Sequence, residues 1–121
     1  MKKLLAIDDV EIMLDLVRLH LGSDYEVVAY QSPKDALKVS EQESFDLILL
    51  DIEMPEMSGI EVLACLKKQS KNMMTPVIML TGKDDIQSIQ ACLTRGAAGY
   101  VAKPFNVVTI RNKVAEILSQ F

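Results

Sequence analysis

The chain has 121 residues, of which 50% are hydrophobic, enough apolar material for the core of one domain expected to span residues 1–121. Its formal net charge of −4 argues against binding to nucleic acid, because such a protein needs many basic side chains to neutralise phosphates. No apolar run approaches the ~18 residues of a membrane-spanning helix, and the two cysteines lack metal-type spacing, which favours a cytoplasmic protein with reduced thiols.

Five short apolar segments alternate with segments that have helical spacing. The apolar segments are rich in Val, Ile and Leu and are bounded by turn residues, which is typical of β-strands. The expected strands span residues 3–8, 26–30, 46–51, 76–81 and 99–102. Helix-capping residues stand between them at Ser32, Ser58, Asp84 and Asn106. The sequence therefore predicts a strand followed by a helix, repeated five times.

Apolar strands that are connected by helices indicate a parallel sheet with helices on both faces. Right-handed crossovers leave few topologies for such a sheet. We expect the α/β class, with a doubly wound five-stranded parallel sheet in the flavodoxin-like strand order 2-1-3-4-5. Ligands of these sheets bind beyond the carboxyl ends of the strands, near the point where the strand order reverses. The residues that end or follow each strand are therefore the candidate site.

Polar side chains occupy four of the five expected strand ends. Asp8 and Asp9 follow the first strand, Asp51 ends the third, Thr81 ends the fourth and Lys103 follows the fifth. Taken singly, most of them have an ordinary interpretation, such as a helix cap for an aspartate. Asp51 has none, because the next helix is capped by Ser58. Together the five side chains indicate a functional site at one edge of the sheet.

Carboxylates that are crowded at one edge require a balancing positive charge. Two of them ~4 Å apart repel each other by about 4 kcal/mol at an effective dielectric near 20. Mg²⁺ removes this cost and suits a site with few carboxylates that also engages phosphate, with Mn²⁺ as an alternative ion. We therefore predict that Asp51 accepts a phosphoryl group, whose charge is balanced by the metal, the Lys103 ammonium and the Thr81 hydroxyl.

The sequence resembles the receiver domains of two-component response regulators over essentially all of its length. The motifs that carry this resemblance are Ile7-Asp8-Asp9, LILLD at residues 47–51, Met54-Pro55, Ser58-Gly59, Leu80-Thr81-Gly82, GAAGY at residues 96–100 and Lys103-Pro104-Phe105. The resemblance implies that Asp51 takes its phosphoryl group from a phosphohistidine on a sensor histidine kinase or a histidine phosphotransfer protein. It also implies that the protein is not an enzyme, although it would catalyse its own phosphotransfer and slow dephosphorylation.

The resemblance further assigns roles around Asp51. Asp8 and Asp9 would hold Mg²⁺ directly or through water, and the backbone carbonyl of Glu53 would complete the protein ligands. Lys103 would contact the phosphoryl group.

A switch is also implied by the resemblance. Thr81 and Tyr100 would form a switch pair that changes the surface made by the fourth helix, fifth strand and fifth helix, and thereby the binding of a downstream target protein. The Lys103-Pro104 bond is expected to be cis.

The first predicted helix has more apolar residues than one inward-facing stripe explains. Residues that suit the stripe are Met13, Leu16, Val17 and Leu21. The surplus residues are Ile12, Leu14 and Leu19, of which we expect some to be exposed. We assign Ile12 and Leu14, with Pro104, to contact with the histidine-bearing partner; scattered surface leucines are the alternative.

Glu53 and Lys83 flank the expected mouth of the site, two residues after Asp51 and Thr81 respectively. Pairing of Lys83 with Glu53 would obstruct the water that hydrolyses an acyl phosphate. We therefore predict a phosphorylated state of moderate to long lifetime, which Lys83→Ala shortens. Because the sequence ends just after its fifth predicted helix, we expect a stand-alone regulator that docks to a partner, or a phosphorelay intermediate.

Three other classes of protein share part of this pattern. A flavodoxin-type FMN carrier has the same fold but needs a Ser-, Thr- or Gly-rich phosphate loop where this chain has Asp8-Asp9. A dehalogenase-type phosphatase has a second aspartate where this chain has Glu53. A degenerate receiver, which acts only as an interaction module, would lack one of the five polar groups, and none is missing.

Overall fold

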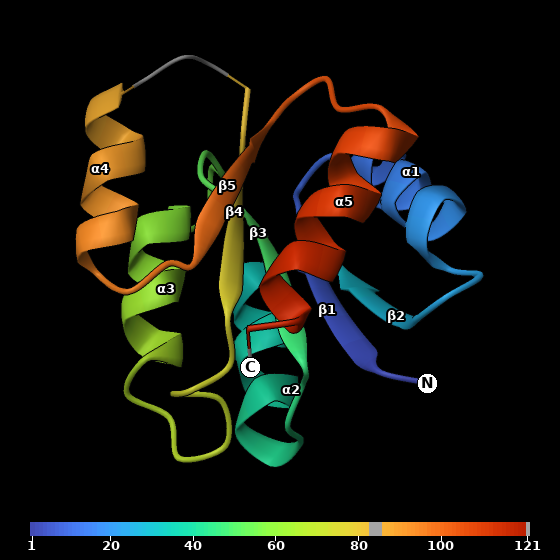
Figure 1. The fold of residues 1–121 in the computed structure, drawn as a ribbon. Coiled ribbons are helices and arrows are strands. Elements are labelled where there is room, and N and C mark those ends of the chain that lie inside the picture. The colour runs from blue at the N-terminus through green and yellow to red at the C-terminus, as the bar shows by residue number, and fades with distance from the viewer. Residues whose placement is uncertain (83–85, 121) are drawn as a thin grey trace.

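The computed structural model describes residues 1–82 and 86–120, which form a parallel sheet between two layers of helices (Figure 1). The strands in this part of the chain are β1 Lys3–Ile7, β2 Glu26–Tyr30, β3 Leu47–Asp51, β4 Val77–Thr81 and β5 Gly99–Ala102. The helices are α1 Glu11–Leu21, α2 Pro33–Gln42, α3 Gly59–Leu66, α4 Ile86–Thr94 and α5 Val107–Leu118. The predicted alternation of strand and helix is confirmed, and no strand boundary differs from its prediction by more than one residue.

The strands are hydrogen-bonded in the order β2-β1-β3-β4-β5, and every neighbouring pair is parallel. This is the predicted doubly wound order. The strand order reverses between β1 and β3, so the carboxyl ends of these two strands flank the point where ligands of such sheets bind. In Figure 1 the carboxyl ends of the strands point toward the top of the view.

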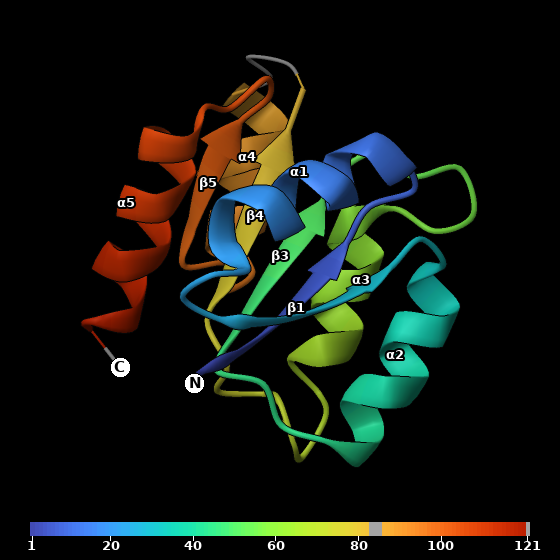
Figure 2. The same ribbon diagram turned by 90° about the vertical axis from the view of Figure 1, so that its right-hand side faces the viewer.

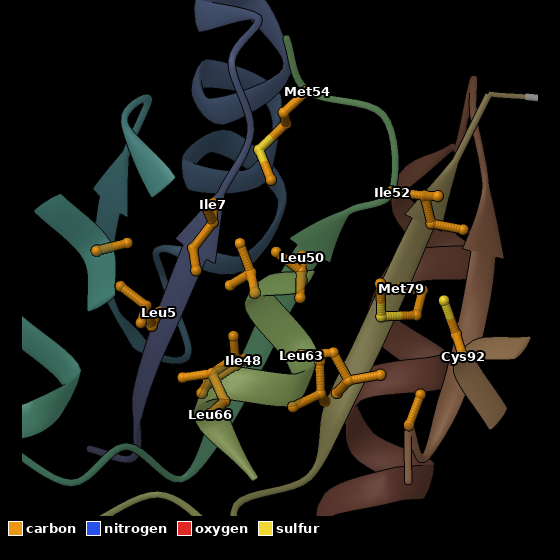
Figure 3. Packing of buried hydrophobic residues seen from close by; sticks show 14 of the residues in the cluster. Leu5, Ile7, Ile48, Leu50, Ile52, Met54, Leu63, Leu66, Met79 and Cys92 are labelled. Atoms are coloured by element: carbon orange, nitrogen blue, oxygen red, sulfur yellow. The ribbon is translucent and has the colours of Figure 1, made fainter. Parts of the chain in front are cut away.

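The core consists of two apolar layers, one on each face of the sheet. Strand β3 is buried along its whole length and contributes alternate side chains to the two layers, because successive residues of a strand point to opposite faces. Ile48 and Leu50 face α2, α3 and α4, whereas Leu47 and Leu49 face α1 and α5. Figure 3 shows the first layer, where Ile48 and Leu50 lie near side chains of α3. The charged Asp51 therefore ends a strand whose other residues are all part of the apolar core.

Side chains at the starts of α2, α3 and α5 satisfy free backbone N–H groups, as the sequence predicted. Ser32 accepts a hydrogen bond from the Asp35 amide at the start of α2, and Asn106 does the same for the Thr109 amide at α5. Ser58 and Glu61 form a reciprocal capping box at α3. The α3 cap fixes where the chain re-enters a helix after β3.

The packing of α1 shows that one prediction was wrong. Leu14 was expected to be exposed for partner docking, but its side chain is buried, with 2% exposure, and packs in the core with Val17 and Leu21. These three residues recur at helical spacing, so the inward stripe of α1 is centred on them, and Met13 and Leu16 lie at its margins, partly buried. Ile12 and Leu19 are exposed, as predicted.

Two further expectations fall on residues 83–85. Lys83, assigned to the mouth of the site, and Asp84, the expected cap of α4, lie outside the described residues. Among the helices within residues 1–82 and 86–120, none has the combined length and apolar character needed to cross a bilayer.

Candidate functional site

The register of the sheet brings the predicted site residues to one edge. Ile7 at the end of β1 pairs with Leu50 of β3. The residues that follow them, Asp8 and Asp51, are therefore neighbours. On the other side, Thr81 at the end of β4 pairs with Ala102 of β5, and the amide of the following Lys103 donates to the Thr81 carbonyl at 2.6 Å. Parallel pairing therefore explains why residues far apart in the sequence meet here.

Three carboxylates form a compact acidic cluster at this edge. Asp8 and Asp51 are buried, Asp9 is half-buried, and each offers an oxygen within 4.8 Å of the others. Carboxylate oxygens at this spacing suit a hard divalent cation, which takes oxygen ligands and offsets their mutual repulsion. The predicted grouping of Asp8, Asp9 and Asp51 is present in the structure.

Lys103 supplies a positive charge to this cluster. Its Nζ lies 2.7 Å from Asp8 Oδ2 and 3.1 Å from Asp51 Oδ1. Burial by itself would lower the pKa of Lys103, but the contacts with Asp8 and Asp51 outweigh burial, so that its pKa is raised. The ammonium therefore stays charged beside the two carboxylates.

The two oxygens of Asp8 are held differently. Oδ1 accepts a hydrogen bond from the Val10 amide at 3.0 Å, which ties the carboxylate to the start of α1. Oδ2 is buried and, despite its ion pair with Lys103, has no well-directed hydrogen bond from the described residues. A buried anionic oxygen with incomplete coordination is a suitable ligand for a cation, and it supports a metal site at this position.

The environment of Asp51 makes its carboxyl unusually basic. Burial raises the pKa of Asp51 most, the neighbouring Asp8 charge raises it further, and Lys103 opposes both, with a net pKa of about 7. A carboxyl group acts as a nucleophile only in its ionised form. A divalent cation near Asp51 would favour that form, so that a bound metal would also make this carboxyl a better nucleophile.

Thr81 and Tyr100, the predicted switch pair, lie on neighbouring strands. Thr81 is buried at the end of β4, next to the strand that carries Asp51. Tyr100 pairs with Met79, two residues earlier along β4, and is 45% exposed. Thr81, whose hydroxyl is predicted to contact the phosphoryl group, is thus beside the strand end that carries Asp51. The ring of Tyr100 lies partly in solvent on the edge strand β5.

The remaining predicted residues surround the mouth of the site. Glu53 is exposed in the loop between β3 and α3, two residues beyond Asp51. Ile12 and Pro104 are also exposed, on the segments that follow Asp9 and Lys103. The Lys103-Pro104 peptide bond is cis, as predicted.

Sequence reasoning gave no separate role to Gly59, the first residue of α3. A Cβ atom added there would lie 2.2 Å from the Asp51 carbonyl oxygen and 2.7 Å from Ile52 Cα. The helix start therefore packs directly against the backbone that carries Asp51, and its amide donates to the Ile52 carbonyl at 2.7 Å. The signal in the sequence was a glycine immediately after the Ser58 cap, where a better helix former is usual.

Comparison with known proteins identifies the family. Residues 4–115 match the response regulator receiver domain, so the chain belongs to this family. The Bacillus subtilis (strain 168) alkaline phosphatase synthesis transcriptional regulatory protein PhoP is 37% identical over 118 residues, which are 97% of this chain and 48% of PhoP. The Enterococcus faecium regulatory protein VanR is 37% identical over 120 residues, 98% of this chain and 51% of VanR. The chain thus spans about half the length of these curated relatives.

A solved structure shows the same architecture. The chemotaxis protein CheY4 of Vibrio cholerae superposes with a TM-score of 0.92 at 32% identity, over 97% of this chain and 98% of CheY4. Together with the family match, this similarity confirms the class and fold predicted from the motifs: a phosphoacceptor signalling switch of the receiver type. Receiver domains bind Mg²⁺ at an acidic pocket and interact with histidine kinases and downstream effectors, and Asp8, Asp9 and Asp51 form such an acidic cluster here.

Proposed function

We propose that Asp51 is the phosphoacceptor of this receiver domain and that its donor is a phosphohistidine on a sensor histidine kinase or a histidine phosphotransfer protein. An oxygen of the Asp51 carboxylate forms a bond to phosphorus while the phosphorus–nitrogen bond breaks, and the imidazole leaves with the bonding electron pair. The observation that carries this proposal is the position of Asp51, buried at the end of the central strand between Asp8 and Lys103.

Asp8, Asp9 and Asp51 would hold Mg²⁺, with the Glu53 backbone carbonyl as a further ligand and Mn²⁺ as an alternative ion. The crowded carboxylates and the incompletely coordinated Asp8 Oδ2 fit this assignment. Bound metal would neutralise the carboxylates and the charge that develops on the phosphoryl oxygens. The cluster is too acidic to receive an anionic donor without such compensation.

Lys103 and Thr81 would hold the transferred group. The Lys103 ammonium contacts Asp51 Oδ1 at 3.1 Å in the free protein and is positioned to contact a phosphoryl oxygen after transfer. The hydroxyl of the buried Thr81 would donate to a second phosphoryl oxygen. The new partner of Thr81 would draw the end of β4 toward Asp51, and this movement is the first step of the switch.

The proposed output is a change in the surface formed by α4, β5 and α5. Movement at Thr81 would open space beside β5 into which the exposed Tyr100 ring turns, and a downstream target protein would bind the altered surface. The chain would act as a signalling protein and not as an enzyme, because both chemical steps, phosphotransfer and slow dephosphorylation, take place on its own side chain.

Docking of the donor protein is assigned to Ile12 and Pro104. Ile12 is 62% exposed at the start of α1, and Pro104 is exposed in the segment after Lys103, so both follow strand ends of the acidic site. A partner that brings a histidine to Asp51 must cover this edge of the sheet. An apolar contact here would hold the partner while the two reacting groups align.

Labelling with acetyl phosphate in the presence of Mg²⁺ tests the proposal. Wild type should gain one acid-labile phosphoryl group, Asp51→Asn should gain none, and EDTA should abolish labelling. Asp15→Asn is the matched control, because Asp15 is an exposed carboxylate on α1 whose side chain pairs with Arg18. Undiminished labelling of Asp51→Asn would overturn the assignment of the phosphoacceptor.

A further inference from the structure

The turn between β2 and α2 and the first turn of α2 contact the two loops that carry proposed metal ligands. Gln31 Nε2 donates a hydrogen bond to the backbone carbonyl of Asp9 at 3.1 Å, in the loop between β1 and α1. Lys34 Nζ lies 3.7 Å from Glu56 Oε1, in the loop between β3 and α3. Figure 2 shows the start of α2 next to this second loop. None of the motifs that define the site lies in the β2–α2 turn.

The Gln31 hydrogen bond connects the segments that follow β1 and β2, just beyond the last backbone hydrogen bond between them. Strands β1 and β2 stay in register up to Ile7 and Tyr30, and the Asp8 amide donates to the Tyr30 carbonyl at 3.2 Å. Beyond this bond the segment that follows β1 turns toward α1. The side-chain amide of Gln31 then supplies the next connection, to the carbonyl of Asp9.

Asp8 and Asp9 differ in how the protein fixes them. The Asp8 carboxylate is buried and held by the Val10 amide and by Lys103. Asp9 is only half-buried, and Gln31 holds its backbone from the neighbouring turn. Mg²⁺ requires a nearly ideal octahedral arrangement of its ligands, so a small displacement of one carboxylate weakens binding, whereas Ca²⁺ tolerates irregular geometry.

We propose that Gln31 is a positioning residue for the metal site: it fixes the backbone of Asp9 and so favours Mg²⁺ over larger cations. This inference depends on the proposed role of Asp9 as a metal ligand. The Lys34–Glu56 ion pair contributes little to the position of the β3–α3 loop, because its side chains are 68% and 45% exposed and solvent screens such pairs. The test therefore concerns Gln31.

Calorimetric titration of wild type, Gln31→Met and Gln42→Met with Mg²⁺ and with Ca²⁺ tests the inference. Methionine keeps the length of the side chain and removes the amide donor. Loss of the hydrogen bond should raise the Mg²⁺ dissociation constant by about threefold and change the Ca²⁺ constant less. Gln42 is exposed at the last residue of α2, so Gln42→Met controls for the loss of a surface amide away from the site. Melting temperatures in EDTA should fall by a few degrees at most in Gln31→Met and be unchanged in Gln42→Met.

The outcomes separate this inference from the proposed function. If wild type does not bind Mg²⁺, the proposed metal site is wrong and the inference fails with it. If wild type binds Mg²⁺ and Gln31→Met binds it equally well, only the inference is overturned. An equal loss of Mg²⁺ and Ca²⁺ affinity would also contradict it, because a geometric role predicts a change in selectivity. Titration at high salt should give the same ratio of Mg²⁺ constants, since the amide carries no charge.

Discussion

Lys103 Nζ lies 3.1 Å from Asp51 Oδ1, so the side chain that follows the edge strand β5 reaches the carboxylate at the end of the central strand β3. The same nitrogen lies 2.7 Å from Asp8 Oδ2. Lys103 therefore occupies part of the charge-balancing position that a metal ion would share. Its ammonium stabilises the free site and competes with a cation for the same oxygens.

Lys103→Met should bind Mg²⁺ more tightly than wild type, at least several-fold, because a competing positive charge a few ångströms away is removed. In EDTA the variant should lose about 3 kcal/mol of unfolding free energy, since two buried carboxylates lose their partner. Calorimetry and urea denaturation measure the two effects, with Lys38→Met, an exposed lysine of α2, as control. Weaker Mg²⁺ binding would instead mean that Lys103 holds the carboxylates in place for the metal.

The fold and the acidic site could be predicted from the sequence for the same reason. Parallel strands in a doubly wound sheet place their carboxyl ends at one edge, so once the apolar runs were identified, the polar residues that follow them had to meet. Asp8, Asp51 and Lys103 were thus predicted together although they are far apart in the sequence. The local helix caps, such as Ser58 with Glu61, were predictable because they depend on residues three apart.

The contacts that were missed are set by tertiary packing. The phase of α1 was ambiguous, because its apolar residues fit more than one inward stripe, and the packing against the sheet selected the stripe that contains Leu14. Gln31 has no neighbour in the sequence that reveals its bond to Asp9. The role of Gly59 depends on how closely α3 approaches β3, which only the three-dimensional structure shows.

Ile12→Ser should slow transfer from a phosphohistidine protein but leave labelling by acetyl phosphate unchanged, because a small donor needs no docking surface. A reduction of several-fold in the protein-to-protein rate is expected for loss of one apolar contact at an interface. Leu19→Ser is the matched control, since Leu19 is 74% exposed on the same helix but near its far end. Equal transfer rates for Ile12→Ser and wild type would leave Ile12 as an ordinary surface residue.

Leu14→Ala should act on stability and not on docking. Its side chain is buried against the sheet, so the truncation should lower the unfolding free energy by about 2–5 kcal/mol. Ile12→Ala, two residues earlier and 62% exposed, should change it by less than about 0.5 kcal/mol. Urea denaturation of the two variants decides the point, and a small effect at Leu14 would contradict the stripe observed in α1.

Asp51 should make the metal-free protein less stable as the pH rises. Its pKa is 3.8 in ordinary surroundings and about 7 in the folded protein, so the folded state binds the proton more tightly than the unfolded state. The resulting stabilisation is complete below pH 3.8 and is lost as the pH rises to about 7. Asp51→Asn stays neutral throughout. In EDTA, its unfolding free energy relative to wild type should therefore increase between pH 5 and 8, by about 2–3 kcal/mol.

Urea denaturation of both proteins at several pH values measures this difference. Mg²⁺ should reduce it at pH 8, because the cation favours the ionised carboxylate in wild type and has one fewer carboxylate to bind in the variant. A difference between the two proteins that stays constant from pH 5 to 8 would show that the carboxyl of Asp51 titrates at its ordinary pKa.

Gly59→Ala should disturb Asp51, the proposed phosphoacceptor, without changing any polar side chain of the site. The new methyl group would lie 2.2 Å from the Asp51 carbonyl oxygen, so either α3 or the end of β3 must move, at a cost of about 1–3 kcal/mol in unfolding free energy. Because Asp51 ends β3, movement of this strand end should slow labelling by acetyl phosphate and weaken Mg²⁺ binding. Gly82→Ala is the control near the same edge, since a Cβ there meets nothing within 4 Å in the described part of the chain. If Gly59→Ala loses stability but keeps both Mg²⁺ affinity and labelling rate, the displacement is absorbed by α3, and Gly59 only allows the helix to pack.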